Sequence, residues 1–440
     1  MTKSRLASLL GSLALLGTLF VVLPGLGADE KKEKGGKDGL YRPLGLFTEV
    51  LTLVRGNYVE KVDVKPLLAG AFSGMTEAMD PFSEYIPPEK MAAFTAYQAA
   101  KAKDAPELGI VLAKRFGYPV VIATIAGSPA AAAGVVSDDL IEKIDGQSAR
   151  GLALWEVEAR LSGKPGTRVR LLVVRDGKPR RRTIDIVSAS WTPEPPAAAR
   201  VAGEMVIRVP SFAPGTAREI KALLAPLDRT KPLALDLRSN AWGTFEEAAR
   251  AAALFVPAGP LGELTGKKIE SRAFGAEPGE RVHDSRLVFL VDSGTAGPAE
   301  FFAAAVQEVL NKAPAKVVAN GTKPGETVVP PAPEDEETYA AEEGAAPLSW
   351  NGKLVRLVGE PSVGMGFTQQ VVKMQSGGSL RVSVGKIRTP SGKALSPKGL
   401  SPDDRVYHVP PDDSIAQPPT DPFLDRAVKV LAEARPKAAA

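Results

Sequence analysis

Two hydroxyl side chains and three lysines lie close together in the second half of the chain. Ser293 and Thr295 are separated by a single glycine, and the lysines that follow are Lys312, Lys316 and Lys323. A hydroxyl whose proton is taken by a neutral amine can attack a carbonyl carbon, which is the first step of acyl transfer. These lysines are more simply explained as solvated surface charges, so acyl transfer by this group stays an alternative.

The composition excludes several other kinds of site. The chain has no cysteine, which excludes a disulfide framework, a thiolate nucleophile and cysteine-ligated zinc. Its only histidines are His283 and His408, and both stand in polar, loop-like sequence that predicts an exposed position. No metal ion and no other cofactor is therefore predicted. With 55 basic and 51 acidic residues the chain has no basic field, so nucleic-acid binding is not predicted either.

Hydrophobic periodicity divides the chain into three folded regions. Residues 40–106 contain two stretches of apolar residues at helical spacing, which predicts a helical N-terminal domain. Residues 107–190 contain short strand-like runs separated by turn signals, and residues 191–435 alternate strands with helices, which predicts an α/β core. The main predicted strands are 109–113, 120–125, 169–174, 205–209, 233–237 and 287–292, and the main predicted helices are 152–161 and 299–310. A proline-rich, acidic insertion at about 321–352 predicts a solvated loop.

The N-terminal sequence predicts export. Basic residues precede a mostly apolar run over residues 6–26, and a charged, glycine-rich tether follows at residues 29–39. This order is typical of a signal peptide cut after Ala28, although the apolar run is also long enough to remain as a membrane tether. Residues 1–28 would then place the body of the protein in the periplasm or on the extracytoplasmic face of the inner membrane.

Several segments resemble the carboxy-terminal processing (tail-specific) serine peptidases, which carry a PDZ domain. In chain order they are LFTEVLTLVRGNYVEKVD, GMTEAMDPFSEYI, GSPAAAAGVVSDDLIEKIDG, LALDLRSNAWGTFEEAARAAALFVP and LVRLVGEPSVGMGFTQQ. The resemblance extends from about residue 44 to residue 432. It implies an α/β fold, α+β overall, made of a helical N-terminal unit, a PDZ-like β-rich domain and a crotonase-like (ClpP/crotonase-type) peptidase core.

The resemblance also implies where the family's catalytic groups would stand. The run from Gly294 to Glu300 is similar to the family's Gly-Ser-Ala-Ser-Ala-Ser-Glu, with Gly297 at the place of the nucleophile. GMGFTQ is similar to Gly-Lys-Gly-x-x-Gln, which puts Met365 at the place of the lysine base and retains the orienting Gln369. Asn240-Ala241-Trp242-Gly243 stands at the oxyanion region, where the bulk of Trp242 would fill the space of a substrate carbonyl. Glycine has no hydroxyl and a thioether accepts no proton, so no intact catalytic residue is expected and the chain is predicted to be a pseudoenzyme.

A PDZ domain binds the free carboxyl end of a peptide, which adds as an extra strand beside a helix. By resemblance, the carboxylate-binding loop here consists of Leu108, Gly109, Ile110 and Val111. One departure is Asp138, which replaces the glycine usual in the turn of this domain. The alternative is that Gly109 only relieves a tight turn and that the helix beside it is ordinary core.

Three functions stay open at this level. The first is a non-catalytic binder of protein or peptide C-termini, an adaptor or regulator whose partners are envelope proteins. The second is an active serine-type endopeptidase that cleaves C-terminal regions with a relocated nucleophile, at Ser293 or Thr295, or with residues from a partner chain. The third is an envelope scaffold whose PDZ-like groove is closed. The sequence identifies neither the ligand nor the oligomeric state.

Overall fold

The structure, a computed structural model, describes residues 38–100, 107–175, 180–312, 350, 352–407 and 420–433. The predicted leader, most of the tether and nearly all of the acidic insertion therefore lie outside the described residues. The chain divides into two compact units, residues 1–67 and 68–440. In the described part of the chain, no helix is long and apolar enough to cross a membrane.

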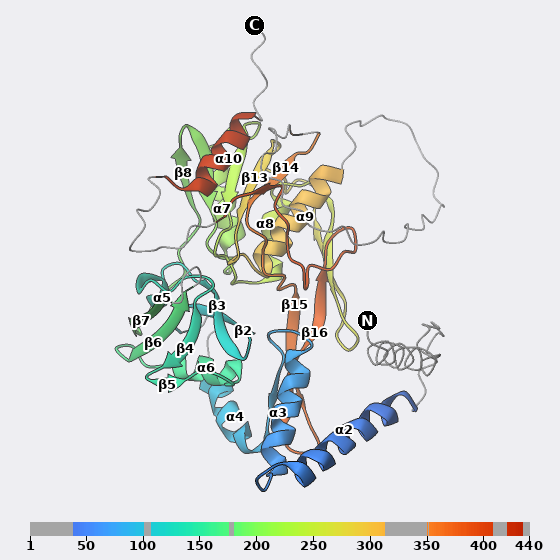
Figure 1. Cartoon of the computed structure of the whole chain (residues 1–440). Coiled ribbons are helices and arrows are strands. Elements are labelled where there is room, and N and C mark those ends of the chain that lie inside the picture. Colours follow the sequence, from blue (N-terminus) through green and yellow to red (C-terminus); the bar gives the residue numbers. More distant parts are fainter. Residues whose placement is uncertain are drawn as a thin grey trace, which may run out of the picture. The chain divides into compact units, whose positions relative to one another are not determined.

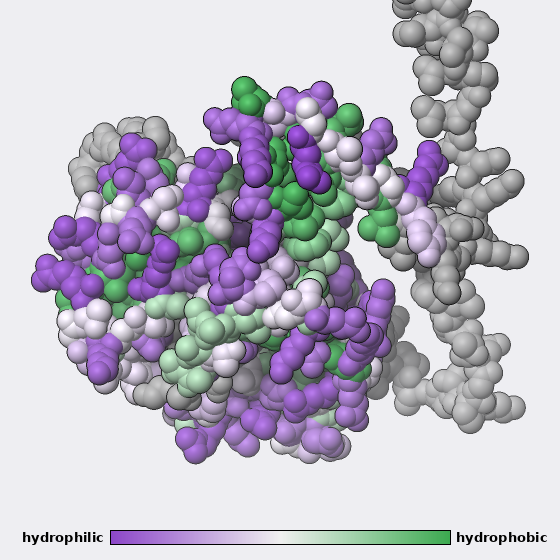
Figure 2. Space-filling view, turned by 90° about the horizontal axis from the view of Figure 1, so that it is seen from below, coloured by the Kyte–Doolittle hydropathy of each residue, from purple (hydrophilic) through white to green (hydrophobic). Residues whose placement is uncertain are grey.

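The first unit is helical over most of its described residues, as the periodicity predicts. Helix α2 spans Asp38–Asn57, and helix α3, Val64–Glu77, begins at the end of this unit. Large apolar side chains of α2 remain exposed, namely Leu44, Leu46, Phe47, Val50 and Leu53. Hydrophobic areas between hydrophilic ones are visible on one face of the molecule (Figure 2). The apolar stripe of α2 therefore predicts the helix correctly but is not buried.

The second unit contains a six-stranded sheet in the order β17-β14-β13-β10-β9-β8, of which β8, β13 and β14 are labelled in Figure 1. Its strands are β8 (Ala197–Val201), β9 (Glu204–Arg208), β10 (Leu233–Asp236), β13 (Leu287–Val291), β14 (Val355–Gly359) and β17 (Asp404–Arg405). All neighbours are parallel except β8, which is antiparallel to β9. Every residue of β10, β13 and β14 is buried, which explains why these strands read as continuous apolar runs.

Helices cover both faces of this sheet. They are α7 (Thr216–Leu224), α8 (Phe245–Ala253), α9 (Pro298–Lys312) and α10 (Pro422–Glu433). On one face of the sheet, Leu235 and Phe289 pack in a core with α7, α8 and α9. On the other face, Ala234 and Val288 pack against α10. Neighbouring strand residues point to opposite faces, so each strand serves both cores. This layering aligns the C-terminal ends of β10 and β13, from which the site loops leave.

A second sheet of five strands lies beside this core, in the order β1-β16-β11-β12 with β15 paired to β16. The strands are β1 (Glu84–Ile86), β11 (Gly259–Thr265), β12 (Arg272–Ala276), β15 (Phe367–Lys373) and β16 (Ser379–Arg388). A 3-10 turn, η1 (Pro88–Lys90), and helix α4 (Met91–Ala100) follow β1. Through β1 and β15, this sheet connects the segment that follows α3 with the segment that follows position 365.

The predicted PDZ-like region forms a third sheet, in the order β2-β3-β4-β6-β7 with β5 paired to β4. Its elements are β2 (Ile110–Arg115), β3 (Tyr118–Thr124), α5 (Pro129–Ala132), β4 (Leu140–Ile144), β5 (Gln147–Ser148), α6 (Leu154–Leu161), β6 (Arg168–Arg175) and β7 (Arg180–Val187). The predicted strands 109–113, 120–125 and 169–174 and the predicted helix 152–161 are confirmed with shifts of one or two residues at their ends. Together the three sheets and their helices confirm the predicted α/β fold.

One expectation about exposure is wrong. His283 is only 2% exposed and its ring lies 6.0 Å from that of Phe255, centroid to centroid. Its backbone N–H donates to the carbonyl of Leu254 at 3.2 Å, which draws this polar stretch beneath the end of α8. His408 lies outside the described residues.

Candidate functional site

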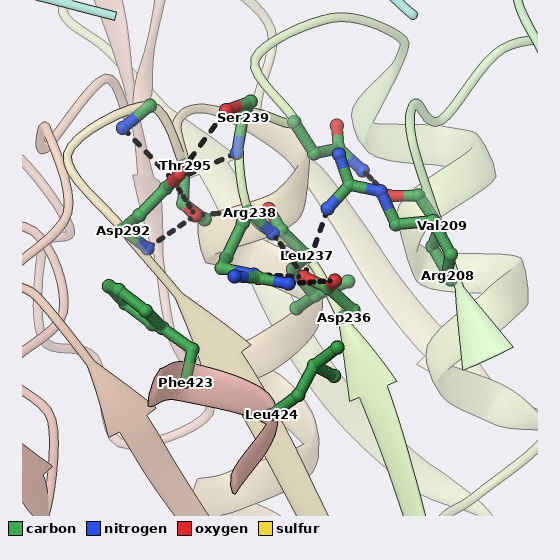
Figure 3. Close-up of polar contacts among 12 residues, drawn as sticks. Arg208, Val209, Asp236, Leu237, Arg238, Ser239, Asp292, Thr295, Phe423 and Leu424 are labelled. Carbon is green, nitrogen blue, oxygen red and sulfur yellow. Dashed lines mark hydrogen bonds and ion pairs between the residues drawn. The ribbon is translucent and has the colours of Figure 1, made fainter. Parts of the chain in front are cut away.

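Two loops leave the C-terminal ends of the neighbouring strands β10 and β13 and form one wall of the site. They are residues 238–243 and residues 292–297. The carboxylate of Asp292 joins them, because it accepts the N–H of Ser239 at 2.8 Å and the N–H of Gly294 at 3.0 Å (Figure 3). Burial raises the pKa of Asp292, against the hydrogen bonds that lower it.

Ion pairs fix the start of the loop 238–243. Asp236, at the end of β10, accepts from Arg238 at 2.7 Å and from Arg208 at 2.9 Å (Figure 3). Arg238 also pairs with Asp421 at 2.8 Å, and its guanidinium lies 5.1 Å from the ring centroid of Phe423. Burial opposes ionisation of Asp236, but the hydrogen bonds and charges of the two arginines outweigh it and hold its pKa below the ordinary value. A charged carboxylate therefore anchors this loop to the start of α10.

The structure brings positions 297 and 365 side by side. A Cβ placed on Gly297 would lie 3.4 Å from Cε of Met365 and 3.6 Å from its carbonyl oxygen. Gly297 has a φ of 58°, in the left-handed region where other residues are strained. The two positions that the sequence identifies are thus neighbours, and the groups they carry are a hydrogen atom and a thioether. Neither can act as nucleophile or base.

Glu300, on the first turn of α9, holds the two loops in this arrangement. It is fully buried, and its carboxylate accepts the N–H groups of Gly297 at 2.9 Å, Gly364 at 2.6 Å and Met365 at 2.8 Å, together with the hydroxyl of Ser362. Burial raises the pKa of Glu300, against these four donors. One side chain therefore fixes the backbone at both positions, although neither carries a reactive group.

The predicted oxyanion region, residues 240–243, is held by backbone pairing with Phe212. The N–H of Phe212 donates to the carbonyl of Trp242 at 2.9 Å, and the N–H of Thr244 donates to the carbonyl of Phe212 at 3.1 Å. A Cβ on Gly243 would lie 2.2 Å from that carbonyl oxygen, so only glycine fits there. The side chain of Trp242 is partly exposed. Its predicted interference with a substrate carbonyl stays a prediction.

Sequence interpretation missed one feature of this region. Pro298 follows Gly297 as the first residue of α9 and has no backbone N–H. In acyl-transfer enzymes the N–H of the residue after the nucleophile is a common oxyanion donor. The motif itself contained the signal, because the family's run has alanine where this chain has Pro298.

Gln369 is present but does not approach position 365 through its amide. Its Nε2 donates to the carbonyl of Phe82 at 2.9 Å, and Phe82 lies in the segment between α3 and β1. The rings of Phe82 and Phe367 are in contact, with 4.9 Å between centroids. In this arrangement Gln369 connects β15 to the segment before β1.

The two hydroxyls considered as relocated nucleophiles have different surroundings. Thr295 is fully buried, and its hydroxyl donates to the carbonyl of Leu237 at 3.0 Å, which leaves no access for a substrate. Ser293 is partly exposed and donates to the carboxylate of Asp138 at 2.7 Å. Asp138 has a φ of 66°, which explains why glycine is usual at its position. Lys316 and Lys323 lie outside the described residues, as does the side chain of Lys312.

The PDZ-like sheet packs against these loops. One apolar cluster contains the core of this sheet together with Ala241 and Ala296, and Met365 packs against it. A Cβ on Gly294 would lie 2.4 Å from Oγ of Ser137 and 3.1 Å from the carbonyl of Ile122. The side chain of Met365 is therefore part of an apolar interface between the PDZ-like sheet and the loops 238–243 and 292–297.

The predicted carboxylate-binding loop lies at the free edge of its sheet, just before and within β2. Leu108 and Ile110 are buried, Val111 is partly buried, and Gly109 has a φ of 75°. A Cβ on Gly109 would lie 2.1 Å from Cβ of Ser128, so this loop requires glycine. The N–H groups of Leu108 and Gly109 have no backbone acceptor within the described residues. Such a loop can accept an anionic ligand group.

Comparison with known proteins separates the PDZ-like region from the peptidase-like core in the same way as the sequence does. The sequence profile of peptidase family S41 matches residues 205–328 and 335–406, and that of the PDZ domain matches residues 120–175. A carboxy-terminal-processing protease of Bartonella bacilliformis is 25% identical over 385 residues, which cover 84% of this chain and 77% of that protein.

The chain is similar in sequence to the carboxy-terminal processing peptidases of family S41. The carboxy-terminal processing protease CtpA of Bacillus subtilis is 27% identical over 356 residues, which cover 79% of this chain and 66% of that protein. Among solved structures, the photosystem II D1 C-terminal processing protease is similar in fold, with a TM-score of 0.57 and 22% identity over 82% of this chain and 86% of that one. Within the described residues, no group of three or more histidine, cysteine, aspartate or glutamate side chains could hold a metal ion.

Proposed function

We propose that this relative of the carboxy-terminal processing peptidases is a non-catalytic protein that binds the carboxyl ends of other proteins or peptides. The observation that carries this proposal is that a glycine and a methionine are neighbours at positions 297 and 365. A Cβ added to Gly297 would lie 3.4 Å from Cε of Met365. Acyl transfer by the family's mechanism needs a hydroxyl and a neutral amine at these two positions. Pro298 removes an oxyanion donor in addition.

The binding half of the proposal is supported by the PDZ domain. Among the described residues, strand β2 pairs with β3 along one edge, and its other edge lies next to α6. A peptide can add as a strand along β2 while the N–H groups of Leu108 and Gly109 receive its carboxylate. At the far end, the N–H of Lys114 is already bonded to the carbonyl of Pro81 at 3.0 Å. The open edge is therefore short, which suits a ligand read at its last few residues.

We also infer that the protein acts in the cell envelope as an adaptor or regulator. The support is the N-terminal sequence, with its basic residues, apolar run and charged tether, and the relatives, which are bacterial carboxy-terminal processing proteases. The division into a leader (1–28), helical region (40–106), PDZ-like region (107–190) and peptidase-like core (191–435) belongs to the same proposal.

Binding and cleavage can be separated with one labelled peptide. The probe is an unstructured peptide with an apolar carboxyl end, compared with the same peptide amidated at that end. We expect the free carboxylate to bind and to remain intact by mass spectrometry, and the amide to bind at least about tenfold more weakly, because it loses charged hydrogen bonds. Cleavage of the probe, or equal affinity for both forms, would contradict the proposal.

A glycine variant localises the binding. Gly109→Ala should abolish it, because the new Cβ would lie 2.1 Å from Ser128. Gly151→Ala is the matched control, since Gly151 has the same φ of 75° in the same domain but no atom within 4 Å of an added Cβ. Both variants carry the same backbone strain, so only the first should lose affinity.

The alternative function is proteolysis by a relocated nucleophile, and one contact favours Ser293 over Thr295. The Ser293 hydroxyl donates to Asp138 at 2.7 Å, and a carboxylate can take a proton from a hydroxyl during attack. This alternative requires a covalent acyl adduct on Ser293 and loss of cleavage in Ser293→Ala. Intact peptide in the presence of the unaltered protein excludes it.

A further inference from the structure

Helix α6, which lies beside strand β2 in the PDZ domain, has no cap of its own. Its N-cap residue is Ala153, whose side chain has no oxygen to accept the N–H groups of the first turn. Glu156 reaches back to the N–H of Ala153 at 3.1 Å, which satisfies one donor before the helix. The donors at the start of the helix proper need another acceptor.

That acceptor comes from outside the PDZ domain. Glu84 in β1 accepts the N–H of Leu154 at 2.6 Å, and its carboxylate is also hydrogen-bonded to the backbone of Trp155. Glu84 precedes Leu154 by 70 residues and is only 3% exposed. A carboxylate in this position also complements the positive end of the helix dipole.

Glu84 is held in turn by the central strand of the second sheet. Arg381 of β16 is the cross-strand partner of Glu84, and its Nη2 lies 2.7 Å from Oε1 of Glu84. The side chains of this pair are 3% and 15% exposed. Buried ion pairs of this kind seldom add net stability over apolar packing, so the pair is better explained by what it positions.

The outer face of α6 is attached to the same neighbours. Trp155 packs edge-on against Phe94 of α4, with 5.4 Å between ring centroids. Lys90 of η1 donates to Glu156 at 2.7 Å. Tyr97 of α4 donates to Glu158. One side of the helix therefore belongs to the PDZ groove, and the other is fastened to the segment 84–97 and to β16.

We propose that Glu84 and Arg381 are positioning residues that set the affinity of the PDZ groove for a peptide carboxyl end, by fixing helix α6 from outside the domain. This inference rests on the proposed function, because it needs the groove to bind a peptide. In the proposed complex the peptide lies between β2 and α6, so the distance between these two elements sets the contacts that its side chains make. An uncapped first turn frays and widens the range of positions that α6 adopts.

The test uses the full chain, the labelled peptide with an apolar carboxyl end, and the variant Glu84→Gln. This change keeps the shape of the side chain but removes its charge and one acceptor oxygen. We expect the affinity to fall about tenfold, because a lost capping interaction destabilises the start of a helix by a free energy of that order. We also expect faster hydrogen exchange at the amides of residues 154 and 155, while the amides of β13 keep their protection.

Two further variants make the result specific. Asp185→Asn removes an exposed carboxylate paired with Arg170 in the same domain and should leave the affinity unchanged. Arg381→Met keeps the apolar stem and removes the charge, and it should weaken binding as Glu84→Gln does. The double variant should lose clearly less affinity than the sum of the two single losses, because the Glu84–Arg381 contact is common to both, although Arg381 also lies 3.9 Å from Glu158 of α6.

The outcomes separate this inference from the function on which it rests. If the unaltered protein binds the peptide and Glu84→Gln binds it equally well, the inference is wrong and the function stands. Additive losses for Glu84→Gln and Arg381→Met would also overturn it, since they would show independent effects. If the unaltered protein binds no peptide carboxyl end, the proposed function fails and the positioning role fails with it.

Discussion

At the scale of single residues, positions 297 and 365 are neighbours that carry a glycine and a methionine. Glu300 still binds the backbone N–H groups of both Gly297 and Met365. Met365 packs against an apolar cluster, and a lysine in such surroundings is held neutral and can serve as a base. One obstacle that side-chain repair at these two positions does not remove is Pro298, which has no backbone N–H.

Stepwise repair tests this reading of the residues. We expect Gly297→Ser with Met365→Lys to remain without detectable cleavage, because no N–H at position 298 stabilises the oxyanion. Adding Pro298→Ala should produce cleavage detectable by mass spectrometry, since one oxyanion donor contributes about 100-fold or more in rate. The control is Met365→Lys with Pro298→Ala, which lacks the hydroxyl. Equal cleavage by the double and triple variants would show that Pro298 is immaterial.

At the scale of elements, the site is built where parallel strands end. The loops after β10 and β13 meet because these strands are neighbours in register, and the partly buried Asp292 and the fully buried Glu300 then bind loop backbone. The order of strands and helices along this part of the chain followed from periodicity. The donors to these two carboxylates did not, because backbone N–H groups leave no trace in a sequence.

The element scale predicts a large effect for a small change at Glu300. In Glu300→Gln, an amide NH2 replaces one carboxylate oxygen and faces N–H donors for which the described part of the chain offers no other acceptor. We expect the free energy of unfolding, measured with denaturant, to fall by about 1–3 kcal/mol. Glu246→Gln on α8 removes one partner of a more exposed ion pair with Arg272 and should cost less than about 1 kcal/mol. Equal losses for the two variants would show that Glu300 does not organise the site loops.

At the scale of the whole molecule, distant segments determine which side chains are buried and what they contact. Gln369 bonds to Phe82 across 287 residues, and Glu84 caps α6 across 70. Neither contact could be predicted, since a periodic pattern reports that a face is apolar but not what covers it. The same limit explains the error at His283, whose polar neighbours indicated exposure although the end of α8 covers it.

Burial of His283 predicts that stability depends on pH. Burial lowers its pKa from 6.5 to about 4, so the unfolded chain takes up this proton at a higher pH than the folded one. The contribution is complete above the unfolded pKa and is lost as the pH falls from about 6.5 to about 4, with a total of about 3 kcal/mol.

The measurement compares unfolding free energies at about pH 7.5 and about pH 4.5 for the unaltered protein and for His283→Phe. Phenylalanine does not titrate, and the aromatic contact with Phe255 can be kept. The difference between the two proteins should shift by about 2–3 kcal/mol against the histidine form at the lower pH. An unchanged difference would mean that the pKa of His283 is the same in the folded and unfolded chain, as expected for an exposed histidine.

The sequence by itself determined which chemical groups exist in this protein. It placed glycine at position 297, methionine at 365 and proline at 298, and the identity of a side chain sets which protons it can give or accept. Tertiary structure alone decided that the first two are neighbours, that Glu300 binds them both, and that a carboxylate from β1 completes a helix of the PDZ domain. These contacts join residues far apart in the chain, and only the packing of three sheets and their helices brings such residues together.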